Sequence, residues 1–348
     1  MKREDDVNRE NQKKPRIAIT MGDVNGIGPE ILTKALAQSE LRDACDPVVF
    51  GSAGAFDRAR RYAPSCPRPM SIASLDAKLP CTQGIALYDA NVPEPPITPG
   101  RVAASAGRCA VTWLEHAVQA AMEGHVDAVV TCPINKEGLR LAGCTEIGHT
   151  EIIARLTRAP DYRMSLFAGA MRIVHISSHC SLADALRLVH ADRIAMTIRV
   201  AHDALTQLHL GSRRIAVAGL NPHAGENGLL GDDESLEIAP AVRRCRAEGI
   251  DCSGPYPPDT VFRRMREGEF DLVVAMYHDQ GHIPLKLIAM DEGVNVTLGI
   301  PIVRTSVDHG TAYDIAWTGR AREHSLCAAI RLAVEFCSHG VGKGATLR

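Results

Sequence analysis

The chain has few aromatic residues, little net charge and no long apolar run, and each shortage excludes a class of protein. Phe, Trp and Tyr make up 4% of its 348 residues, too few for the stacking platforms that bind single-stranded nucleic acid. The formal net charge is -2, so no overall positive field attracts nucleic acid or an anionic membrane. No stretch is long and apolar enough to cross a bilayer. We therefore expect neither a nucleic-acid partner nor a membrane.

Paired cysteine motifs and a targeting segment are missing as well. The 11 cysteines are odd in number and include no C-x-x-C pair, which argues against a disulfide framework or a cysteine zinc site and favours a reducing compartment. Residues 1–14 are polar and mixed in charge, without the apolar core of a signal peptide. We expect a disordered tail at 1–14 and a cytoplasmic protein.

Short apolar, β-branched runs alternate with amphipathic segments along the rest of the chain. This alternation predicts βαβ units, an α/β fold and a largely parallel sheet, in one large unit or two lobes. A helix is expected to open at Pro29, where the missing N–H costs least, and the Pro-rich residues 92–100 are expected to form a loop. The expected strands are residues 16–20, 126–131, 172–176, 214–219 and 271–276, with a further helix over 105–124.

Three histidines fall just after predicted strands, where parallel sheets bind ligands. They are His179, His223 and His278. Three imidazoles from three strand ends can converge on one divalent ion and leave open positions for a substrate. Taken singly, a histidine at such a position is more often a hydrogen-bonded loop residue than a metal ligand, and the repeated placement after strands favours the metal site without deciding it.

Two further stretches are candidates for binding an anion. His149 and Thr150 directly precede a helical run, and Thr150 can cap a helix whose N-terminus holds a phosphate, or simply cap it. Lys286, Asn295 and Arg304 lie in an otherwise apolar region. The two cations offer charge and forked donors to phosphate or carboxylate, with buried ion pairs as the alternative.

The Gly-rich turn over residues 22–28 resembles a nucleotide loop but lacks the third glycine of the dinucleotide fingerprint. The chain has no P-loop and no Gly-x-Ser-x-Gly elbow of a serine hydrolase. The turn alone therefore does not establish a cofactor.

Taken together, the motifs resemble the 4-hydroxythreonine-4-phosphate dehydrogenase family. They occur in order over nearly the whole chain after the tail. The matching stretches are residues 21–31, 133–136, 148–151, 219–226, 258–262, 277–281 and 293–312.

This resemblance implies two α/β lobes like those of isocitrate and isopropylmalate dehydrogenases. The first lobe would comprise 15–150 plus 299–348 and the second 151–298, with the active site in the cleft between them. It also implies a homodimer whose active site draws on both subunits. The residues it implies are His179, His223 and His278 as ligands of one divalent metal ion; His149, Thr150, Lys286, Asn295 and Arg304 as substrate contacts; and Gly310, Thr311, Ala312 and Asp314 in an adenosine-binding loop for NAD.

The chain departs from the family's pattern at two positions. Val24 stands where the family usually has Pro, and Trp317 stands where it usually has Gly. A bulky indole beside the adenosine loop could alter the grip on the cofactor, which leaves NAD and NADP both open. Residues 174–179 and residues 278–284, with His282, resemble the branch that acts on 4-phospho-D-threonate or 4-phospho-D-erythronate.

The implied reaction oxidises the C3 hydroxyl of a four-carbon 4-phosphorylated acid to a 3-keto acid, which decarboxylates. Lys286, Asp279 and Asp259 are candidate bases or orienting groups. Zinc, magnesium, manganese and cobalt are all possible metals, and three imidazoles favour the softer ions. The alternatives are the 4-hydroxythreonine-4-phosphate dehydrogenase of pyridoxal phosphate biosynthesis, a cis-dihydrodiol dehydrogenase, and an inactive nucleotide-binding protein.

Overall fold

A computed structural model describes residues 14–75 and 84–338 of the chain. The expected disordered tail therefore lies, except for Lys14, outside the described residues. The chain divides into two compact units. Unit 1 comprises residues 1–149, 309–323 and 330–348, and unit 2 comprises 150–308 and 324–329.

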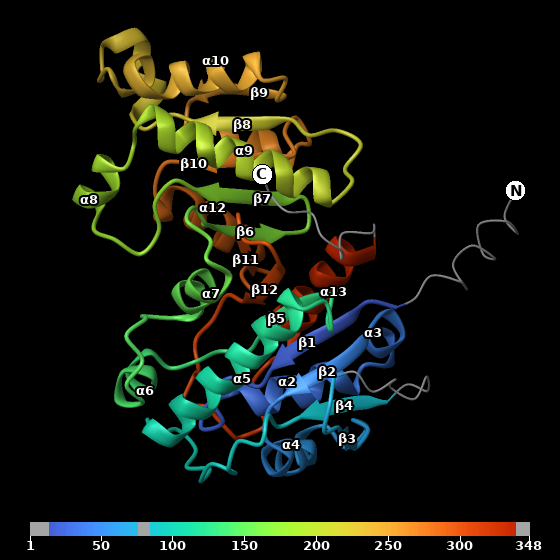
Figure 1. The fold of residues 1–348 in the computed structure, drawn as a ribbon. Coiled ribbons are helices and arrows are strands. Elements are labelled where there is room, and N and C mark those ends of the chain that lie inside the picture. The colour runs from blue at the N-terminus through green and yellow to red at the C-terminus, as the bar shows by residue number, and fades with distance from the viewer. Residues whose placement is uncertain (1–13, 76–83, 339–348) are drawn as a thin grey trace, which may run out of the picture. The chain divides into compact units, whose positions relative to one another are not determined.

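Unit 1 contains parallel strands in the order β3-β4-β2-β1-β5. Their interiors are buried, as the apolar runs predict: all four residues of β5 are inaccessible to solvent. The strands are β1 (Arg16–Thr20), β2 (Asp46–Phe50), β3 (Pro69–Ser71), β4 (Ile85–Tyr88) and β5 (Ala128–Thr131) (Figure 1). The helices are α2 (Gly28–Ala37), α3 (Ser39–Ala44), α4 (Ala53–Ala59), η1 (Arg60–Tyr62), α5 (Ala104–Met122) and α6 (Lys136–Leu141).

Unit 2 contains a mixed sheet in the order β12-β11-β6-β7-β10-β8-β9. The neighbours from β12 to β7 are antiparallel, and those from β7 to β9 are parallel. The strands are β6 (Arg163–Ala168), β7 (Met171–His175), β8 (Ile215–Ala218), β9 (Cys252–Tyr256), β10 (Leu272–Ala275), β11 (Val294–Leu298) and β12 (Val303–Val307). The helices are α8 (Leu182–Arg187), α9 (Ala191–Gln207), η2 (Pro222–Gly228), η3 (Glu234–Ile238), α10 (Ala239–Ala247), α11 (Val261–Arg266) and α12 (His278–Ala289). Helices α7 (His149–Thr157) and α13 (His324–Ser338) include residues of both units.

The α/β class is confirmed, and each strand expected from the sequence is present within two residues of its expected start. Two details differ. Residues 299–308 belong to unit 2 because β12 pairs with β11, whereas the sequence placed them in the first lobe. Helix α7 begins at His149, so Thr150 lies in its first turn and is not the residue that precedes and caps the helix.

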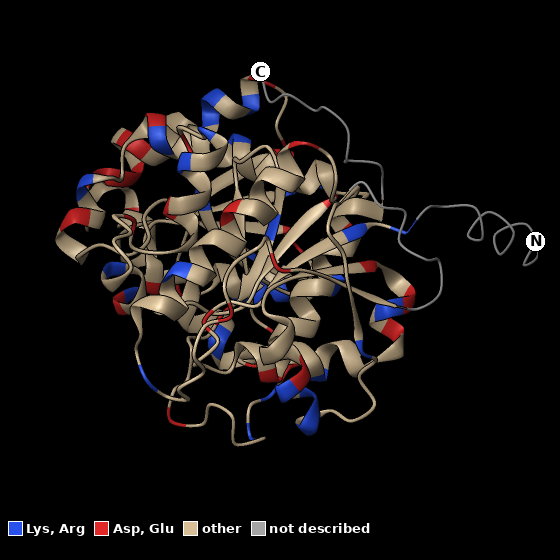
Figure 2. Ribbon diagram, turned by 60° about the horizontal axis from the view of Figure 1, so that its bottom comes forward, with Lys and Arg blue, Asp and Glu red and all other residues tan. Residues whose placement is uncertain are grey.

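The surface and the thiols agree with the composition. Basic and acidic residues are interspersed along the ribbon (Figure 2), as a net charge near zero predicts. None of the ten cysteines in the described part of the chain forms a disulfide, and Cys132 is wholly buried, where desolvation raises the pKa of its thiol. No helix within the described ranges is long and apolar enough to span a membrane.

Candidate functional site

In unit 2, the residues from His278 to His282 form the first turns of α12, directly after β10. The side chain of Gln280 is buried there, and its amide makes two hydrogen bonds. Its Oε1 accepts from the N–H of Met276 at 2.7 Å, and its Nε2 donates to the carbonyl of Gly219 at 2.8 Å. Gln280 therefore fastens the end of β10 to the end of β8, where the loop carrying His223 begins.

His278 is held in one tautomer by its neighbour in the chain. Its Nδ1 lies 2.6 Å from a carboxylate oxygen of Asp279, so this nitrogen carries the proton and donates it. The lone pair of Nε2 is then available to a metal ion or a substrate proton. The ring of His179 lies beside it, with 5.7 Å between the two ring centres. The structure thus brings together two of the three histidines that the sequence proposes as ligands.

His282 and His175 extend this arrangement inward. The ring of His282 stacks on that of His278 at 3.6 Å and 12°. His175 Nδ1 lies 3.2 Å from the carbonyl of Met164, and because a carbonyl only accepts, this nitrogen is protonated. His175 Nε2 must then accept from His282 Nδ1, at 3.2 Å. The Met164 carbonyl therefore fixes the tautomers of His175 and His282, and in both rings Nδ1 carries the proton.

Both inner imidazoles are neutral. Burial lowers the pKa of His175 to about 3, and burial with the nearby His278 lowers the pKa of His282 to about 4. In the sequence, both His175 and His282 stand out only as parts of stretches that resemble one branch of the family. A histidine at the end of an apolar strand, such as His175, otherwise has the pattern of an ordinary core residue.

Gly281 is required by the close packing of this cluster. A Cβ at this position would lie 2.5 Å from His175 Nε2 and 2.6 Å from the Cγ2 of Ile173. No side chain fits there without displacing the buried imidazole.

His223 lies in a strained turn. The five residues from His223 to Asn227 all have positive φ, although only Gly225 is a glycine. Each non-glycine residue in this conformation costs roughly 1–2 kcal/mol. The turn is held by the buried carboxylate of Glu234, which accepts from the backbone N–H groups of Leu220 and Asn221, both at 2.8 Å. Backbone strain that surrounding contacts hold in place often marks a functional segment.

No group of three or more His, Cys, Asp or Glu residues close enough to hold a metal ion occurs among the residues that the structure describes. His223 therefore does not complete a site with His179 and His278 within one chain. The three-histidine metal site stays a prediction.

Lys286 lies on the same face of α12 as His278 and His282, since the three are spaced by four residues. Its ammonium forms an ion pair with Asp308 at 3.0 Å. Asp259, the third candidate base, is exposed in the turn before α11. Of the three candidates, Asp279 contacts His278 and Lys286 shares the helix face.

Arg304 and Asn295, both proposed as substrate contacts, contact each other. The Arg304 guanidinium is buried and donates to Asn295 Oδ1 at 2.9 Å and to Thr297 Oγ1 at 3.0 Å. Burial lowers the pKa of Arg304 to about 10, and the charge of Glu151 in α7 opposes this shift. The first turn of α7, which holds Thr150, is thus linked electrostatically to Arg304. His149 and Thr150 are half-buried.

In unit 1, the proposed adenosine loop is attached to the Gly-rich turn. The N–H of Ile27 donates to the carbonyl of Thr311 at 3.0 Å, and the hydroxyl of Tyr313 donates to the buried carboxylate of Asp23 at 2.6 Å. A Cβ at Gly26 would lie 2.9 Å from Thr311. The turn and the loop, nearly 300 residues apart in the chain, form one structure.

The turn itself does not offer a phosphate site. The N–H groups of Asp23, Asn25, Gly26 and Ile27 all donate to protein oxygens, and a phosphate loop needs such groups free. Burial raises the pKa of Asp23, while its bond from Tyr313 lowers it. The resemblance to a nucleotide loop thus reflects a tight turn that supports residues 309–317.

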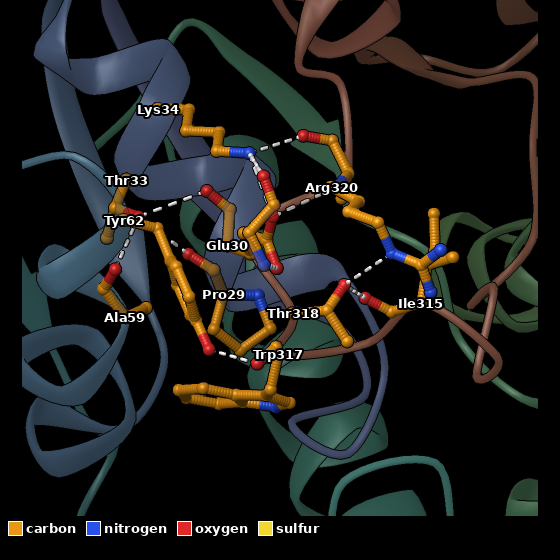
Figure 3. Close-up of polar contacts among 12 residues, drawn as sticks. Pro29, Glu30, Thr33, Lys34, Ala59, Tyr62, Ile315, Trp317, Thr318 and Arg320 are labelled. Carbon is orange, nitrogen blue, oxygen red and sulfur yellow. Dashed lines mark hydrogen bonds and ion pairs between the residues drawn. The ribbon is translucent and has the colours of Figure 1, made fainter.

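The segment after this loop is fastened to α2. Glu30 accepts from the N–H groups of Gly319 and Ala321, at 3.1 and 3.0 Å. Lys34 forms an ion pair with Glu30 at 2.8 Å and donates to the carbonyls of the same two residues (Figure 3). The loop residues Gly310 and Asp314 are exposed.

Comparison with known proteins matches residues 43–333 to the family model described as pyridoxal phosphate biosynthetic protein PdxA. The chain is 45% identical over 323 residues to the D-threonate 4-phosphate dehydrogenase of Pectobacterium atrosepticum, covering 92% of this chain and 98% of that one. It is 44% identical over 324 residues to the 4-hydroxythreonine-4-phosphate dehydrogenase of Desulfosudis oleivorans, covering 92% and 96%. A crystal structure of a 4-hydroxythreonine-4-phosphate dehydrogenase from Klebsiella pneumoniae is 45% identical, with a TM-score of 0.82 over 93% of this chain and 99% of that one.

Replacing Gly281 by Ala should lower the free energy of unfolding by about 1–3 kcal/mol, the usual range for overpacking a core. The added methyl group must displace His175 or Ile173. Urea denaturation measures the change. Gly211→Ala is the matched control, because a Cβ at Gly211 meets nothing within 4 Å. Equal stability of the two variants would contradict the required close approach.

The stability of the fold should fall as the pH drops from about 6.5 toward 4. A histidine in the unfolded chain titrates near 6.5, whereas the folded pKa values are about 3 for His175 and about 4 for His282. The unfolded chain therefore binds protons first, and the stability that the neutral rings contribute is lost across this window. In a thermal-unfolding series over pH, His175→Phe should show a smaller drop than the unchanged protein; identical slopes would refute the assignment.

Proposed function

Because the chain belongs to the PdxA family of pyridoxal phosphate biosynthetic proteins, we propose that it oxidises 4-phospho-D-threonate or 4-phospho-D-erythronate. The chain is a dehydrogenase of this family. NAD would be the oxidant and one divalent metal ion the second cofactor. The observation that carries the proposal is the pair of His179 and His278, with Asp279 fixing the tautomer of His278. The described cysteines are thiols outside disulfides, which supports the expected cytoplasmic location.

The histidine pair fits a metal ion. Two imidazoles on one tetrahedral zinc ion, with bonds of about 2.1 Å, have ring centres roughly 5 Å apart, and those of His179 and His278 are 5.7 Å apart. A carboxylate on the far nitrogen of a histidine ligand is the usual support for such a bond. Nitrogen ligands favour zinc or cobalt over magnesium, with manganese between them. The third ligand would be His223.

The chain's own residues would bind and orient the acid. Arg304, with Asn295, supplies a buried positive charge for its anionic groups, together with His149 and Thr150 at the start of α7. Binding energy from the phosphate would then orient C3 for reaction.

After its ammonium has lost a proton to solvent, Lys286 would take the proton of the C3 hydroxyl, which restores the ammonium and its ion pair with Asp308. When bound, the metal would polarise this hydroxyl and NAD would accept the hydride from C3. The product is a 3-keto acid, and because its carboxylate is β to the new carbonyl, the carboxylate can leave as CO2.

The second candidate substrate is 4-phosphohydroxy-L-threonine, which differs at C2. It deserves testing because a relative named 4-hydroxythreonine-4-phosphate dehydrogenase is 44% identical, nearly as similar as the D-threonate enzyme. His282, the sequence feature that favours the sugar acids, stacks directly on His278.

With NAD and zinc, kcat/KM should be at least about tenfold higher for 4-phospho-D-threonate or 4-phospho-D-erythronate than for 4-phosphohydroxy-L-threonine. NADH absorbance measures the rate, with a carbocyclic cis-diol as a further substrate. A preference for the amino acid would assign the chain to pyridoxal phosphate biosynthesis, and a preference for the diol would make it a cis-dihydrodiol dehydrogenase. No NADH from any of them would indicate an inactive nucleotide-binding protein.

The proposed homodimer would complete the metal site. Ile283, Leu287 and Met290 share one face of α12 and its end and are 64%, 85% and 75% exposed. An apolar helix face this exposed is usually covered by a partner, and this one belongs to the helix that begins with His278. We propose that a second copy covers it and contributes His223 to the site that holds His278.

His223→Ala and His278→Ala should each lose bound metal and activity while keeping the fold. Co-refolding the two inactive variants in equal amounts should restore about a quarter of normal activity, because half of the dimers are mixed and each has one intact site. Enzyme assay and metal analysis of the isolated mixed dimer check this. A monomer in light scattering, or a mixed dimer without activity, would refute the shared site.

A further inference from the structure

Trp317, which follows the proposed adenosine loop, contacts Val24 in the Gly-rich turn. The indole Nε1 of Trp317 donates to the backbone carbonyl of Val24 at 2.8 Å, across 293 positions of sequence. Both side chains are buried, Val24 completely. This bond joins the end of the proposed adenosine loop to the Gly-rich turn, so Trp317 and Val24 belong to one local structure.

We propose that Trp317 is a positioning residue that holds the adenosine loop in the shape that binds NAD. This inference rests on the proposed use of NAD, and it adds a determinant of cofactor affinity that lies outside the residues proposed to contact the cofactor. Trp317 acts through the loop and has no part in the chemistry at C3.

The backbone of Trp317 requires such a restraint. Its φ of 60° is a conformation that glycine adopts freely and that a bulky residue rarely adopts. The loop would relax from this shape if nothing held it. Two hydrogen bonds hold it: the indole bond to Val24, and the hydroxyl of Tyr62, which donates to the carbonyl of Trp317 (Figure 3).

Two guanidinium groups cover the indole. That of Arg58 in α4 lies 5.0 Å from the ring centre, and that of Arg61 in η1 lies 5.9 Å from it. Arg61 also lies 4.6 Å from the ring of Tyr62. These cation–π contacts keep the indole in place and away from solvent. Trp317 thus attaches the loop to α4, η1 and the Gly-rich turn together.

Two of the proposed cofactor residues, Ala312 and Asp314, lie between two sets of anchors. Thr311 and Tyr313 bind the turn at the front of the loop, and Trp317 binds it at the rear. Ala312, also left-handed with φ 42°, and the exposed Asp314 lie between these anchors. A loop ordered in advance binds its ligand without the entropy loss of ordering. Removal of the rear anchor should therefore weaken NAD binding and leave hydride transfer from the bound state unchanged.

The test measures NAD binding by calorimetry in the full-length protein without substrate, so that no turnover is needed. Trp317→Gly removes the indole but keeps a residue suited to positive φ, and it should raise the Kd for NAD about tenfold. Trp317→Phe keeps an aromatic face for Arg58 and loses the N–H donor. Its Kd for NAD should therefore lie between that of the unmodified protein and that of Trp317→Gly. In turnover assays, the KM for NAD should rise in parallel while kcat stays within about twofold.

Trp113→Phe is the matched control. Trp113 is the other of the chain's two tryptophans; it is buried in α5 of the same unit, and its indole donates to the carbonyl of Asp89. Loss of the Trp113 indole should lower the melting temperature but leave the Kd for NAD within about twofold of that of the unmodified protein. In this variant Trp317 is the sole tryptophan, so a change of its emission on adding NAD would support its place beside the cofactor loop.

An unchanged Kd in Trp317→Gly, or an equal rise in Trp113→Phe, would overturn the role of Trp317 while leaving the use of NAD intact. An unmodified protein that binds no NAD at all would instead refute the proposed cofactor, and the inference with it.

Discussion

The histidine cluster depends on the side-chain amide of Gln280. Its two hydrogen bonds join the end of β10 to the end of β8, so the first turn of α12 and the start of the loop with His223 keep a fixed relation. The residues around it divide the remaining tasks: Asp279 sets the proton on His278, Gly281 makes space for His175, and His282 stacks on His278. A separate physical role thus explains the residue type at each position from 278 to 282.

The elements that the sequence predicts best are those with a strong periodic pattern. Buried strands and the long helix α5 follow from apolar runs, and the placement of His179 and His278 after strands follows from the same pattern. The role of His175 could not be predicted, because its hydrogen bonds run to residues on β6 and α12 that only the folded sheet brings near. Nor could the left-handed turn at His223, since Glu234, which holds it, lies beyond the turn and shows no local pattern.

In the Gly-rich turn of unit 1, the glycine pattern correctly predicts a turn but does not predict its function. Its glycine spacing suggests phosphate binding, but the fold uses its N–H groups for hydrogen bonds within the protein. Two of these bonds go to carbonyls distant in sequence, those of Thr311 and Pro133, and the other two go to Asp23 within the turn. Sequence patterns report local backbone shape, whereas the fate of each N–H group is decided by tertiary contacts.

The discontinuity of unit 1 has a consequence for biosynthesis. Asp23 and Glu30 leave the ribosome almost 300 residues before Tyr313, Gly319 and Ala321, which supply part of the hydrogen bonds to their buried carboxylates. All of unit 2 up to residue 308 is translated in between. A nascent chain can therefore complete its second unit while the first still lacks the segment that packs against α2 and the Gly-rich turn, and contacts this far apart make folding slow. The unit that is begun first is finished last.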